Sequence, residues 1–372
     1  MKRVRFAVVI CMVLSMLGTA CAAGVPSQAP AAQVPHLETT PQPSTSPETP
    51  IPPGGLSPDA IASLNSLQQV DDYPLYTMLY VGETTFSQLE TLPRVETAVG
   101  APLIFTPQSA SSPDSWGCSL FAALAEGEDR LYGRNFDWEF SPALLLFTSP
   151  PDGYASVSMV DIAYLGFGGS EAQGLVEQPL EKLQNLLQAP AWPFDGMNSQ
   201  GLAIGMAAVP DGNVRPDPDK ATLDSLMVMR EILDHAADVA QALEIFNRYN
   251  IDMGGGPPLH YLLADSTGEA ALVEFYQGEL RVITNEEPYH LATNFLLSAA
   301  GGFPAGQCWR YDAIRETLEA ERGSLTAEQA IQMLANVAQD STQWSVVYDM
   351  TSLEVRVVAG QQYEQVHCFE LK

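Results

Sequence analysis

Apolar and polar residues alternate in short blocks along most of the chain after residue 117, and turn residues separate these blocks. An apolar run at 118–124, an acidic turn at 126–129 and a return along 130–135 predict a β-hairpin. Residues 143–148 are almost wholly apolar, which predicts a buried strand. The same reasoning predicts further strands at 154–164, 259–264, 269–275, 279–283, 289–293, 344–349 and 353–358, and residues 198–209 predict a turn at 199–201 that leads into a strand.

Other segments carry apolar residues at the spacing of one helix face. Leucines in 177–187 predict a helix, and residues 223–237 form a strongly amphipathic one. Blocks of strands beside blocks of helices indicate an α+β fold, in which helices cover antiparallel sheets. Further helices are expected at 239–246, 308–320 and 326–338, the last with Thr326 as a suitable start.

The first 20 residues have the pattern of an export signal. A basic start, an apolar stretch at 6–17 and small residues precede Cys21, and the stretch is too short for a membrane-spanning helix. Cys21 is similar to the lipid-acceptor cysteine of bacterial lipoproteins, although the preceding aliphatic residue lies one position farther away than usual. We therefore expect an exported protein, lipid-anchored in the cell envelope on the extracytoplasmic side. A secreted protein, cut near residues 20–23, is the alternative.

Two more segments precede residue 118. Residues 21–57 begin with the candidate anchor cysteine and are rich in Pro, Ser, Thr and Ala, which predicts a disordered tether. Residues 58–117 are too apolar for a linker. They are either a propeptide that covers the site or a segment that stays packed on the catalytic domain, residues 118–372. Within them we expect a helix at 59–67, a strand at 75–81 and an exposed loop at 107–117.

The chain carries a formal net charge of −28. Such a charge repels phosphate backbones and anionic membrane surfaces, which argues against nucleic acid as a partner and leaves the lipid anchor as the expected membrane contact. The sequence contains no metal-ligand spacing, phosphate loop or dinucleotide fingerprint, so we expect neither a metal nor another cofactor.

Cys118 opens the predicted hairpin, and Arg134 and Asp137 follow 16 and 19 residues later. The hairpin brings both residues back toward the thiol. An arginine beside a thiol favours the thiolate, the form that attacks a carbonyl carbon, and a carboxylate nearby orients an amine or holds the arginine. The residues alone leave a second interpretation open, namely a buried core cysteine next to a surface Arg/Asp pair.

Cys118, Gly133-Arg134-Asn135, Asp137 and Glu139 resemble the start of the choloylglycine hydrolase family, the linear amide C–N hydrolases of the N-terminal nucleophile superfamily. Bile salt hydrolases, penicillin V acylases and acid ceramidase-like amidases belong to this group. The resemblance extends from residue 118 to about residue 348. It implies a four-layer αββα sandwich and an enzyme that hydrolyses a linear N-acyl amide bond.

The resemblance also implies that Cys118 becomes the first residue of the mature chain. Its free α-amino group then serves as general base for its own thiol, which makes Gly117–Cys118 the processing bond. Attack of the thiol on the preceding carbonyl, an N-to-S acyl shift and hydrolysis of the thioester would release the segment before it. Gly117 has no β-carbon and leaves that carbonyl accessible.

The remaining site residues follow from the order of the family motifs. Asp137 would hold the α-amino group, and Arg134 and Arg310 would stabilise the thiolate. Asn294, at the end of a predicted strand, would help to bind the oxyanion of the tetrahedral intermediate. His260 matches a strand motif of the family and is expected to be structural.

Residues 195–202 resemble the family turn that precedes a strand lining the substrate pocket, so Asn198 and Ala208 are expected at the oxyanion or substrate pocket. Ala208 falls where bile salt hydrolases have asparagine and penicillin V acylases have tyrosine. Its backbone N–H can still donate to the oxyanion, but the side chain that helps to define those two specificities is missing. The resemblance therefore leaves the acyl and amine parts of the substrate open.

Cys308 and Cys368 have no role in this scheme. In an oxidising envelope compartment they either form a disulfide that ties the C-terminus to the core or remain two free thiols.

The sequence thus predicts an exported cysteine hydrolase that cleaves a small-molecule N-acyl amide through an acyl-thioester on Cys118. One alternative is an acyltransferase that uses the same site to pass the acyl group to an amine. The other is a non-catalytic envelope-binding lipoprotein with the same fold. The sequence makes no prediction of the oligomeric state.

Overall fold

The computed structural model describes residues 55–84, 117–127, 129–213, 215–254 and 256–372. The expected export signal, Cys21 and nearly all of the expected tether lie outside the described residues, as does most of the loop expected at 107–117. In the described part of the chain, no helix has both the length and the apolar character that crossing a membrane requires. The described residues belong to one compact unit.

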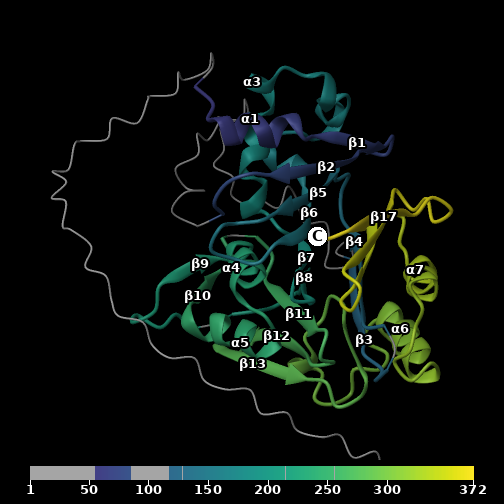
Figure 1. Cartoon of the computed structure of the whole chain (residues 1–372). Helices are drawn as coiled ribbons and strands as arrows, with labels where there is room; N and C mark the ends of the chain where they lie inside the picture. The colour runs from purple at the N-terminus through teal and green to yellow at the C-terminus, as the bar shows by residue number, and fades with distance from the viewer. Residues whose placement is uncertain (1–54, 85–116, 128, 214, 255) are drawn as a thin grey trace, which may run out of the picture. The chain divides into compact units, whose positions relative to one another are not determined.

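A nine-stranded sheet forms one half of this unit (Figure 1). Its neighbouring strands are antiparallel except for β2 and β5, which run parallel. In spatial order the strands are β1 (Gln68–Asp71), β2 (Leu75–Tyr80), β5 (Ala143–Thr148), β6 (Ser156–Asp161), β7 (Asp195–Asn198), β8 (Leu202–Ala208), β11 (Leu259–Asp265), β12 (Ala270–Tyr276) and β13 (Glu279–Thr284).

A six-stranded antiparallel sheet forms the other half. The predicted hairpin lies at its centre, with Cys118 paired to Phe136 across the two strands. In spatial order the strands are β14 (Tyr289–Ala292), β3 (Gly117–Ala123), β4 (Leu131–Asp137), β15 (Thr342–Asp349), β16 (Glu354–Ala359) and β17 (His367–Glu370). A small parallel pair, β9 (Thr222–Asp224) and β10 (Asn250–Asp252), stands apart from both sheets.

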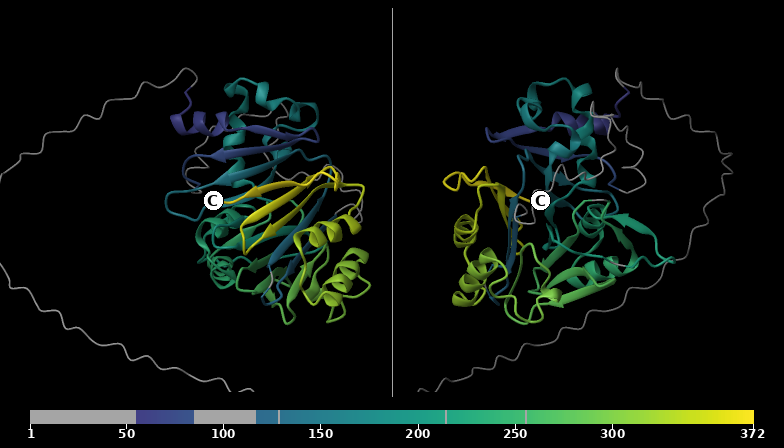
Figure 2. Two further views of the ribbon diagram at one scale, coloured as in Figure 1. Left: turned by 45° about the vertical axis from the view of Figure 1, so that its right-hand side comes forward. Right: turned by 180° about the vertical axis from the view of Figure 1, so that it is seen from behind.

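Helices cover the outer face of each sheet, as the views in Figure 2 show. Helices α4 (Met227–His235) and α5 (Val239–Arg248) pack on the nine-stranded sheet, and α6 (Trp309–Ala320) and α7 (Ala327–Asn336) pack on the six-stranded sheet. Thr326 and Gln329 form a reciprocal capping box at the start of α7, as its sequence predicts. The order of layers is therefore αββα, which confirms the predicted fold class.

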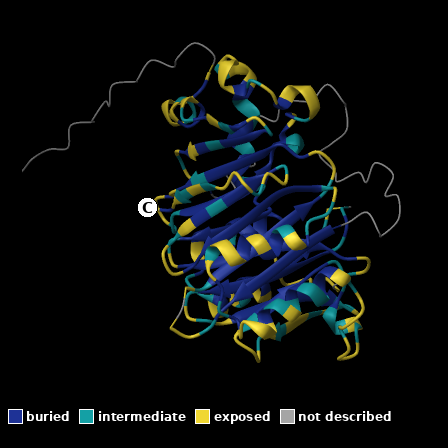
Figure 3. Cartoon of the chain, turned by 90° about the vertical axis from the view of Figure 1, so that its right-hand side faces the viewer, coloured by how far each residue is buried: buried dark blue, intermediate teal, exposed yellow. Residues whose placement is uncertain are grey.

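The central strands are buried on both faces (Figure 3). Because successive side chains of a strand point to opposite faces, β3 sends Leu120 and Ala122 into the core between the sheets. Its alternate residues Phe121 and Ala123 pack instead against α6 and α7. Because both faces of β3 are buried, its sequence is mostly apolar instead of alternating between apolar and polar residues.

The N-terminal part of the described chain is built into the same unit. Helix α1 (Pro58–Asn65) begins at Ser57, whose side chain accepts a hydrogen bond from the Ala60 N–H at 3.1 Å. The apolar residues of α1 and β2 pack in a separate cluster against β5 and β6. The expected helix at 59–67 and strand at 75–81 are both found, each within a few residues of its expected ends.

The prediction of a helix at 177–187 is largely wrong. Only α3 (Leu180–Leu183) is α-helical, and a 3₁₀ segment, η5 (Gln184–Ala191), follows it. Pro190 lies inside that segment, where its ring prevents a regular α-helical hydrogen bond. Leu183, Leu186 and Leu187 are buried nevertheless, so the apolar spacing correctly indicates which residues face the core.

Candidate active site

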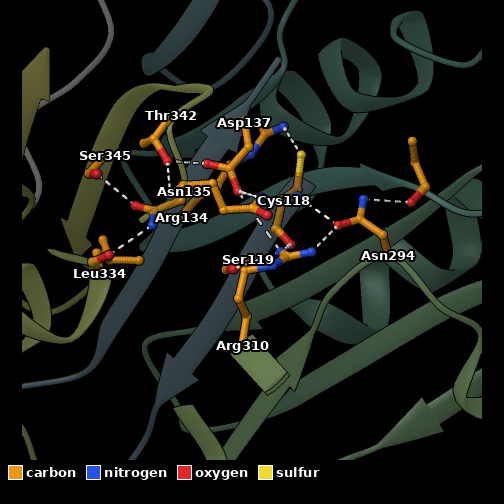
Figure 4. A network of polar contacts seen from close by, with 12 residues as sticks. Cys118, Ser119, Arg134, Asn135, Asp137, Asn294, Arg310, Leu334, Thr342 and Ser345 are labelled. Atoms are coloured by element: carbon orange, nitrogen blue, oxygen red, sulfur yellow. Dashed lines mark hydrogen bonds and ion pairs between the residues drawn. The ribbon is translucent and has the colours of Figure 1, made fainter. Parts of the chain in front are cut away.

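Cys118 is the second residue of β3, and its side chain is almost completely buried. Arg134 on the neighbouring strand β4 points the same way and places Nη2 3.7 Å from the Cys118 Sγ (Figure 4). The hairpin therefore brings the cation to the sulfur, as the spacing of the two residues predicts. A guanidinium at this distance can balance negative charge on the sulfur.

Asp195 holds Arg134 in this position. Its Oδ2 lies 2.7 Å from Nη1 of Arg134, and both side chains are fully buried. The other oxygen, Oδ1, accepts a hydrogen bond from the Tyr348 hydroxyl at 2.5 Å, and the indole N–H of Trp344 lies 3.4 Å from Oδ2. Arg134 also donates to the carbonyl oxygen of Phe194. The guanidinium thus lies between a carboxylate and the thiol.

The charges of this pair influence each other strongly. Burial raises the pKa of Asp195, and the neighbouring Arg134 acts against that shift. For Arg134, burial by itself lowers the pKa, but Asp195 and then Cys118 outweigh burial and the net pKa is raised. Asp195 lies in the motif at 195–202, but no pattern in the sequence predicts its contact with Arg134.

Asn294 lies at the backbone of Cys118, just beyond the end of β14. Its Oδ1 accepts a hydrogen bond from the Cys118 N–H at 2.7 Å, and its Nδ2 donates to the carbonyl oxygen of Ala208 at 2.8 Å. The side-chain amide thus connects β3 with the end of β8. The structure brings together Cys118, Asn294 and Ala208, as the sequence analysis expects.

Arg310 reaches the same place from α6, but it contacts different atoms from those expected. Its guanidinium donates to the carbonyl oxygen of Cys118, to Ser119 Oγ at 3.1 Å and to Asn294 Oδ1 at 3.0 Å. Both arginines were expected beside the Cys118 sulfur, but of the two only Arg134 contacts it. Because α6 covers the outer face of β3, Arg310 meets the backbone there and orients Asn294.

Asp137 lies opposite Gly117 at the end of the hairpin. Its Oδ1 accepts a hydrogen bond from the Thr342 hydroxyl, and its Oδ2 accepts one from Gln339 Nε2 at 2.8 Å. Burial raises the pKa of Asp137, while these two hydrogen bonds and Arg310, 3.9 Å away, lower it. In the continuous chain, the single N–H of Cys118 donates to Asn294 rather than to Asp137.

Gly117 fits a space that admits no side chain. A β-carbon at this position would stand 1.8 Å from Gln339 Nε2 and 2.8 Å from both the Cβ and the Oδ2 of Asp137. Such distances are far below van der Waals contact, so a larger residue would displace the two side chains. The structure therefore gives a steric reason for glycine before Cys118.

A small apolar cavity opens on Cys118. Its volume is about 20 Å³, enough for roughly one water molecule. A larger cavity of about 520 Å³ lies beside α1 and β2, but Cys118 does not line it, so the smaller cavity is the candidate site. Beyond Cys118, the smaller cavity is lined by Phe136, Trp138, Tyr164, Phe194, Met206, Ala208, Pro257 and Leu259.

Known proteins are similar to this chain both in sequence and in fold. Residues 192–354 match the model of the family described as acyl-coenzyme A:6-aminopenicillanic acid acyl-transferase. A mutant conjugated bile acid hydrolase from Clostridium perfringens superposes with a TM-score of 0.50 at 15% sequence identity, over 68% of this chain and 92% of that one. The chain has the fold of the N-terminal nucleophile hydrolases. The predicted resemblance to the choloylglycine hydrolase group is confirmed.

A penicillin V acylase from Agrobacterium tumefaciens also matches this chain. It has a TM-score of 0.46 and 16% identity, over 68% of this chain and 86% of that one. At such identities the similarity concerns the fold.

The prediction of Asn198 as a pocket residue is wrong. Its Nδ2 donates to the carbonyl oxygens of Leu233 and Ala236, at 3.1 and 2.7 Å, at the end of α4. Its Oδ1 accepts hydrogen bonds from the N–H groups of Gln200 and Leu202. A buried amide with four partners is fully engaged, so Asn198 stabilises the turn between β7 and β8.

Cys308 and Cys368 are separate free thiols, so the disulfide interpretation is wrong for this fold. Cys308 precedes α6, which packs on β14 and β3, whereas Cys368 lies in β17 at the opposite edge of the sheet. From β3 to β17 the sheet spans four strand spacings, about 19 Å. A disulfide requires Cα atoms within about 7 Å.

His260 is buried in β11, as expected of a structural histidine, and its Nδ1 lies 3.5 Å from Glu274 Oε1. The two oxygens of Glu274 accept hydrogen bonds from the N–H groups of Leu297 and Ser298, at 2.7 and 2.8 Å. These residues follow Asn294, so Glu274 supports the loop that carries the oxyanion candidate. No group of three or more metal-ligating side chains occurs in the described ranges.

The cavity wall depends on a buried carboxyl group with a shifted pKa. Asp161 caps the 3₁₀ segment η2 (Ile162–Leu165), which carries Tyr164, by accepting the Ala163 N–H at 2.9 Å. Burial raises the pKa of Asp161 to about 7, against the effect of hydrogen bonds from Ser141 and Ala163. Between about pH 4 and pH 7 the folded state therefore binds more protons than the unfolded state, and stability falls as the pH rises.

We expect Asp161→Asn, which keeps a capping oxygen, to remove this pH dependence. The pKa shift corresponds to about 4 kcal/mol of unfolding free energy in the limit of high pH. Urea unfolding at pH 5 and pH 8 should show that, as the pH rises, the unfolding free energy of wild type falls by about 2 kcal/mol or more relative to that of the variant. Asp152→Asn, at an exposed position, is the control. If the difference in unfolding free energy between variant and wild type were the same at both pH values, the raised pKa of Asp161 would be contradicted.

Proposed function

We propose that the protein is an exported cysteine hydrolase of the N-terminal nucleophile type, which cleaves a linear N-acyl amide bond through an acyl-thioester on Cys118. The observation that carries the proposal is the convergence on this one residue. Arg134 lies at its sulfur, while Asn294 and Arg310 bind its backbone. Burying an arginine and its carboxylate costs free energy, and a cysteine that only fills the core would not require such a pair at its sulfur.

The first step is cleavage of the chain before Cys118. The thiol attacks the Gly117 carbonyl carbon, the peptide nitrogen takes the proton as the C–N bond breaks, and a thioester forms. Water then hydrolyses the thioester, which regenerates the thiol and leaves a free α-amino group on Cys118. The Arg134 guanidinium supports charge on the sulfur during this step.

The second step is turnover with the α-amino group as general base. It takes the thiol proton, and the sulfur attacks the substrate carbonyl carbon. The oxyanion forms next to Asn294 and the backbone at Ala208, where donors typically lower the barrier by a few kcal/mol. The amine leaves with the proton, and water hydrolyses the acyl-thioester. Asp137 lies beside the Gly117 position and can hold the freed amine once Gly117 has departed.

The cavity wall favours an apolar acyl group. Phe136, Phe194 and Met206 present no charge to it, and Tyr164 stacks on Trp192 with ring centroids 5.9 Å apart. Ala208 contributes only a methyl group, which leaves room at the position where the related enzymes carry a larger side chain. A panel of N-acyl amides that includes bile salts, penicillin V, acyl-homoserine lactones and fatty acyl amino acids would identify the substrate.

Intact mass and N-terminal sequencing of the purified wild-type protein test this mechanism. We expect a chain that begins at Cys118. An active wild-type protein with an uncleaved Gly117–Cys118 bond would refute the N-terminal nucleophile mechanism. Export and lipid attachment at Cys21 are tested separately, by radiolabelled palmitate incorporation in wild type and in Cys21→Ala.

Gly117→Ala is expected to slow the cleavage by at least about tenfold, because the added methyl group would displace Gln339 and Asp137. The rate is read as conversion of full-length chain during a pulse-chase experiment. Gly127→Ala serves as the control, since a β-carbon there meets no atom within 4 Å, although its positive φ adds strain. Equal cleavage rates in wild type and Gly117→Ala would contradict the steric argument.

An acyltransferase is the second candidate function, and the family match favours it, because that family is described as an acyl-transferase. Here the acyl group passes from the Cys118 sulfur to an amine instead of to water. Product analysis in the presence of hydroxylamine or 6-aminopenicillanic acid separates the two functions. Acylated amine as the main product would favour the transferase.

A further inference from the structure

Strand β12 carries one charged residue, Glu274, and its side chain is fully buried. A carboxylate in such a place destabilises the fold unless hydrogen bonds satisfy its oxygens. Each oxygen of Glu274 accepts one backbone hydrogen bond: Oε1 from the Leu297 N–H at 2.7 Å, and Oε2 from the Ser298 N–H at 2.8 Å. Oε1 also lies 3.5 Å from Nδ1 of His260 in β11. The carboxylate therefore connects the nine-stranded sheet to the loop that follows β14.

Glu274 serves as a cap for a helical segment that has no cap of its own. Leu297 and Ser298 are the first two residues of a short 3₁₀ segment, and Leu296, which precedes them, makes no side-chain cap. The free N–H groups at the start of a helix favour a negative charge. Burial acts to raise the pKa of Glu274, but the contacts with His260 and Ser298 outweigh burial and the net pKa is lowered. Glu274 is thus a carboxylate at neutral pH, as this contact requires.

The same loop carries Asn294, three residues before Leu297. Between them, Phe295 packs edge-on against Tyr311 of α6 with ring centroids 5.2 Å apart, and Leu296 is buried. Because the side chains of this stretch are packed, a displacement at Leu297 is passed on to Asn294. The position of Asn294 thus depends on the end of β14 on one side and on the buried carboxylate on the other.

Asn294 in turn determines how the scissile peptide is held. The N–H of Cys118 belongs to the Gly117–Cys118 peptide bond, and it donates to Asn294 Oδ1 at 2.7 Å (Figure 4). Because a peptide group is planar, a fixed N–H also fixes the direction of the Gly117 carbonyl group, which the thiol attacks. The rate of such an attack depends steeply on the geometry of the reacting atoms.

We propose that Glu274 is a positioning residue for cleavage of the chain before Cys118, and that it holds the loop of Asn294 so that the scissile peptide faces the thiol. The inference rests on the proposed function. Glu274 acts through the loop and not on the reacting atoms. The same contact supports Asn294 during turnover, when the substrate oxyanion forms beside it.

Glu274→Gln tests the proposal by pulse-chase measurement of the cleavage rate. The glutamine oxygen accepts only one of the two loop N–H groups, and the glutamine NH2 group meets the other, so the loop shifts. We expect cleavage to be slower by at least about tenfold. Glu274→Asp keeps the charge but withdraws it from the loop by one methylene group. It is the second variant, in which slower cleavage is also expected, should Glu274→Gln fail to fold.

Asp265→Asn is the matched control. Asp265 is also buried, and it accepts backbone hydrogen bonds from Val239 at 2.9 Å and from Thr267 at 2.8 Å. It lies at the end of β11 opposite to Leu259, which lines the cavity. The control variant therefore loses a comparable buried carboxylate at a distance from Asn294, and we expect its cleavage rate to stay within about twofold of wild type.

Hydrogen exchange shows whether the loop itself moves. It is measured by mass spectrometry in a Cys118→Ala background, in which every chain is expected to stay uncut. We expect the N–H groups of Leu297 and Ser298 to exchange at least about tenfold faster when Glu274→Gln is added, because they lose a charged acceptor. Adding Asp265→Asn should leave their exchange unchanged. Unchanged exchange with Glu274→Gln would overturn the inference.

A double variant separates positioning from a general loss of stability. In Asn294→Ala the residue that Glu274 positions is gone, so adding Glu274→Gln should slow cleavage by no more than about twofold further. A further tenfold loss would overturn the inference and leave the nucleophile mechanism intact. Wild-type cleavage rates in the folded Glu274 variants would do the same. An active wild-type protein that stays uncut would overturn both.

Discussion

We expect Cys118→Ala to leave the chain at its full length and to abolish amide hydrolysis. Without the sulfur, the Gly117 carbonyl has no nucleophile, so neither the N-to-S shift nor the acyl-thioester can form. Loss of a nucleophile that acts together with its neighbours costs at least about 10⁴-fold in kcat. Intact mass reports the missing cleavage, and release of the amine from an N-acyl amide that wild type hydrolyses reports the missing turnover.

Two further cysteines supply matched controls for this result. Cys308→Ala and Cys368→Ala each remove a free thiol outside the cavity, so cleavage and turnover should stay within about twofold of wild type. Because Cys118 packs in the central core cluster, the folded state of Cys118→Ala is checked by thermal unfolding. Normal cleavage in folded Cys118→Ala would refute the proposed mechanism.

We expect Asp195→Asn to lower both the stability of the fold and the reactivity of the Cys118 thiol. The substitution leaves the buried guanidinium of Arg134 without its counter-charge, and breaking a buried ion pair typically costs about 3–5 kcal/mol. The guanidinium should also shift from its place beside Cys118 Sγ. A displacement of about 1 Å in such a site lowers kcat by roughly 10²-fold. Urea unfolding gives the stability, and alkylation of Cys118 by iodoacetamide gives the reactivity.

The chain offers a second buried arginine–aspartate pair as a matched control. Arg230 Nη2 lies 2.5 Å from Asp234 Oδ1 within α4, and both side chains are buried. Asp234→Asn should cost a similar amount of stability, but it should leave the alkylation rate of Cys118 unchanged. If Asp195→Asn and Asp234→Asn alter that rate equally, Asp195 contributes to the fold alone.

The sequence predicts the hairpin of β3 and β4 because its signals are local. An apolar run, an acidic turn and a second run determine the register, and the register places Arg134 on the same face as Cys118. The succession of strand and helix patterns likewise predicts antiparallel sheets covered by helices, and the family resemblance adds the αββα order of layers. The leucine spacing at 177–187 predicts an α-helix, but much of this segment belongs to the 3₁₀ segment η5, which contains Pro190.

Partners from distant strands are harder to predict. Asp195 lies 61 residues after Arg134 and belongs to the other sheet, so their ion pair depends on how the sheets pack. The same motif contains Asn198, which a family resemblance places near the substrate. In the fold that amide instead binds the end of α4.

The sequence by itself determines that Cys118, Arg134 and Gly117 lie close together, because the three residues belong to one hairpin, and the family resemblance adds the expectation that Cys118 is the nucleophile. Tertiary structure alone decides that Arg310 contacts the Cys118 carbonyl, that Cys308 and Cys368 stay apart, and that β2 fills a place in the main sheet. Apolar burial and strand pairing bring these elements together over long stretches of chain, and no local pattern encodes which surfaces meet.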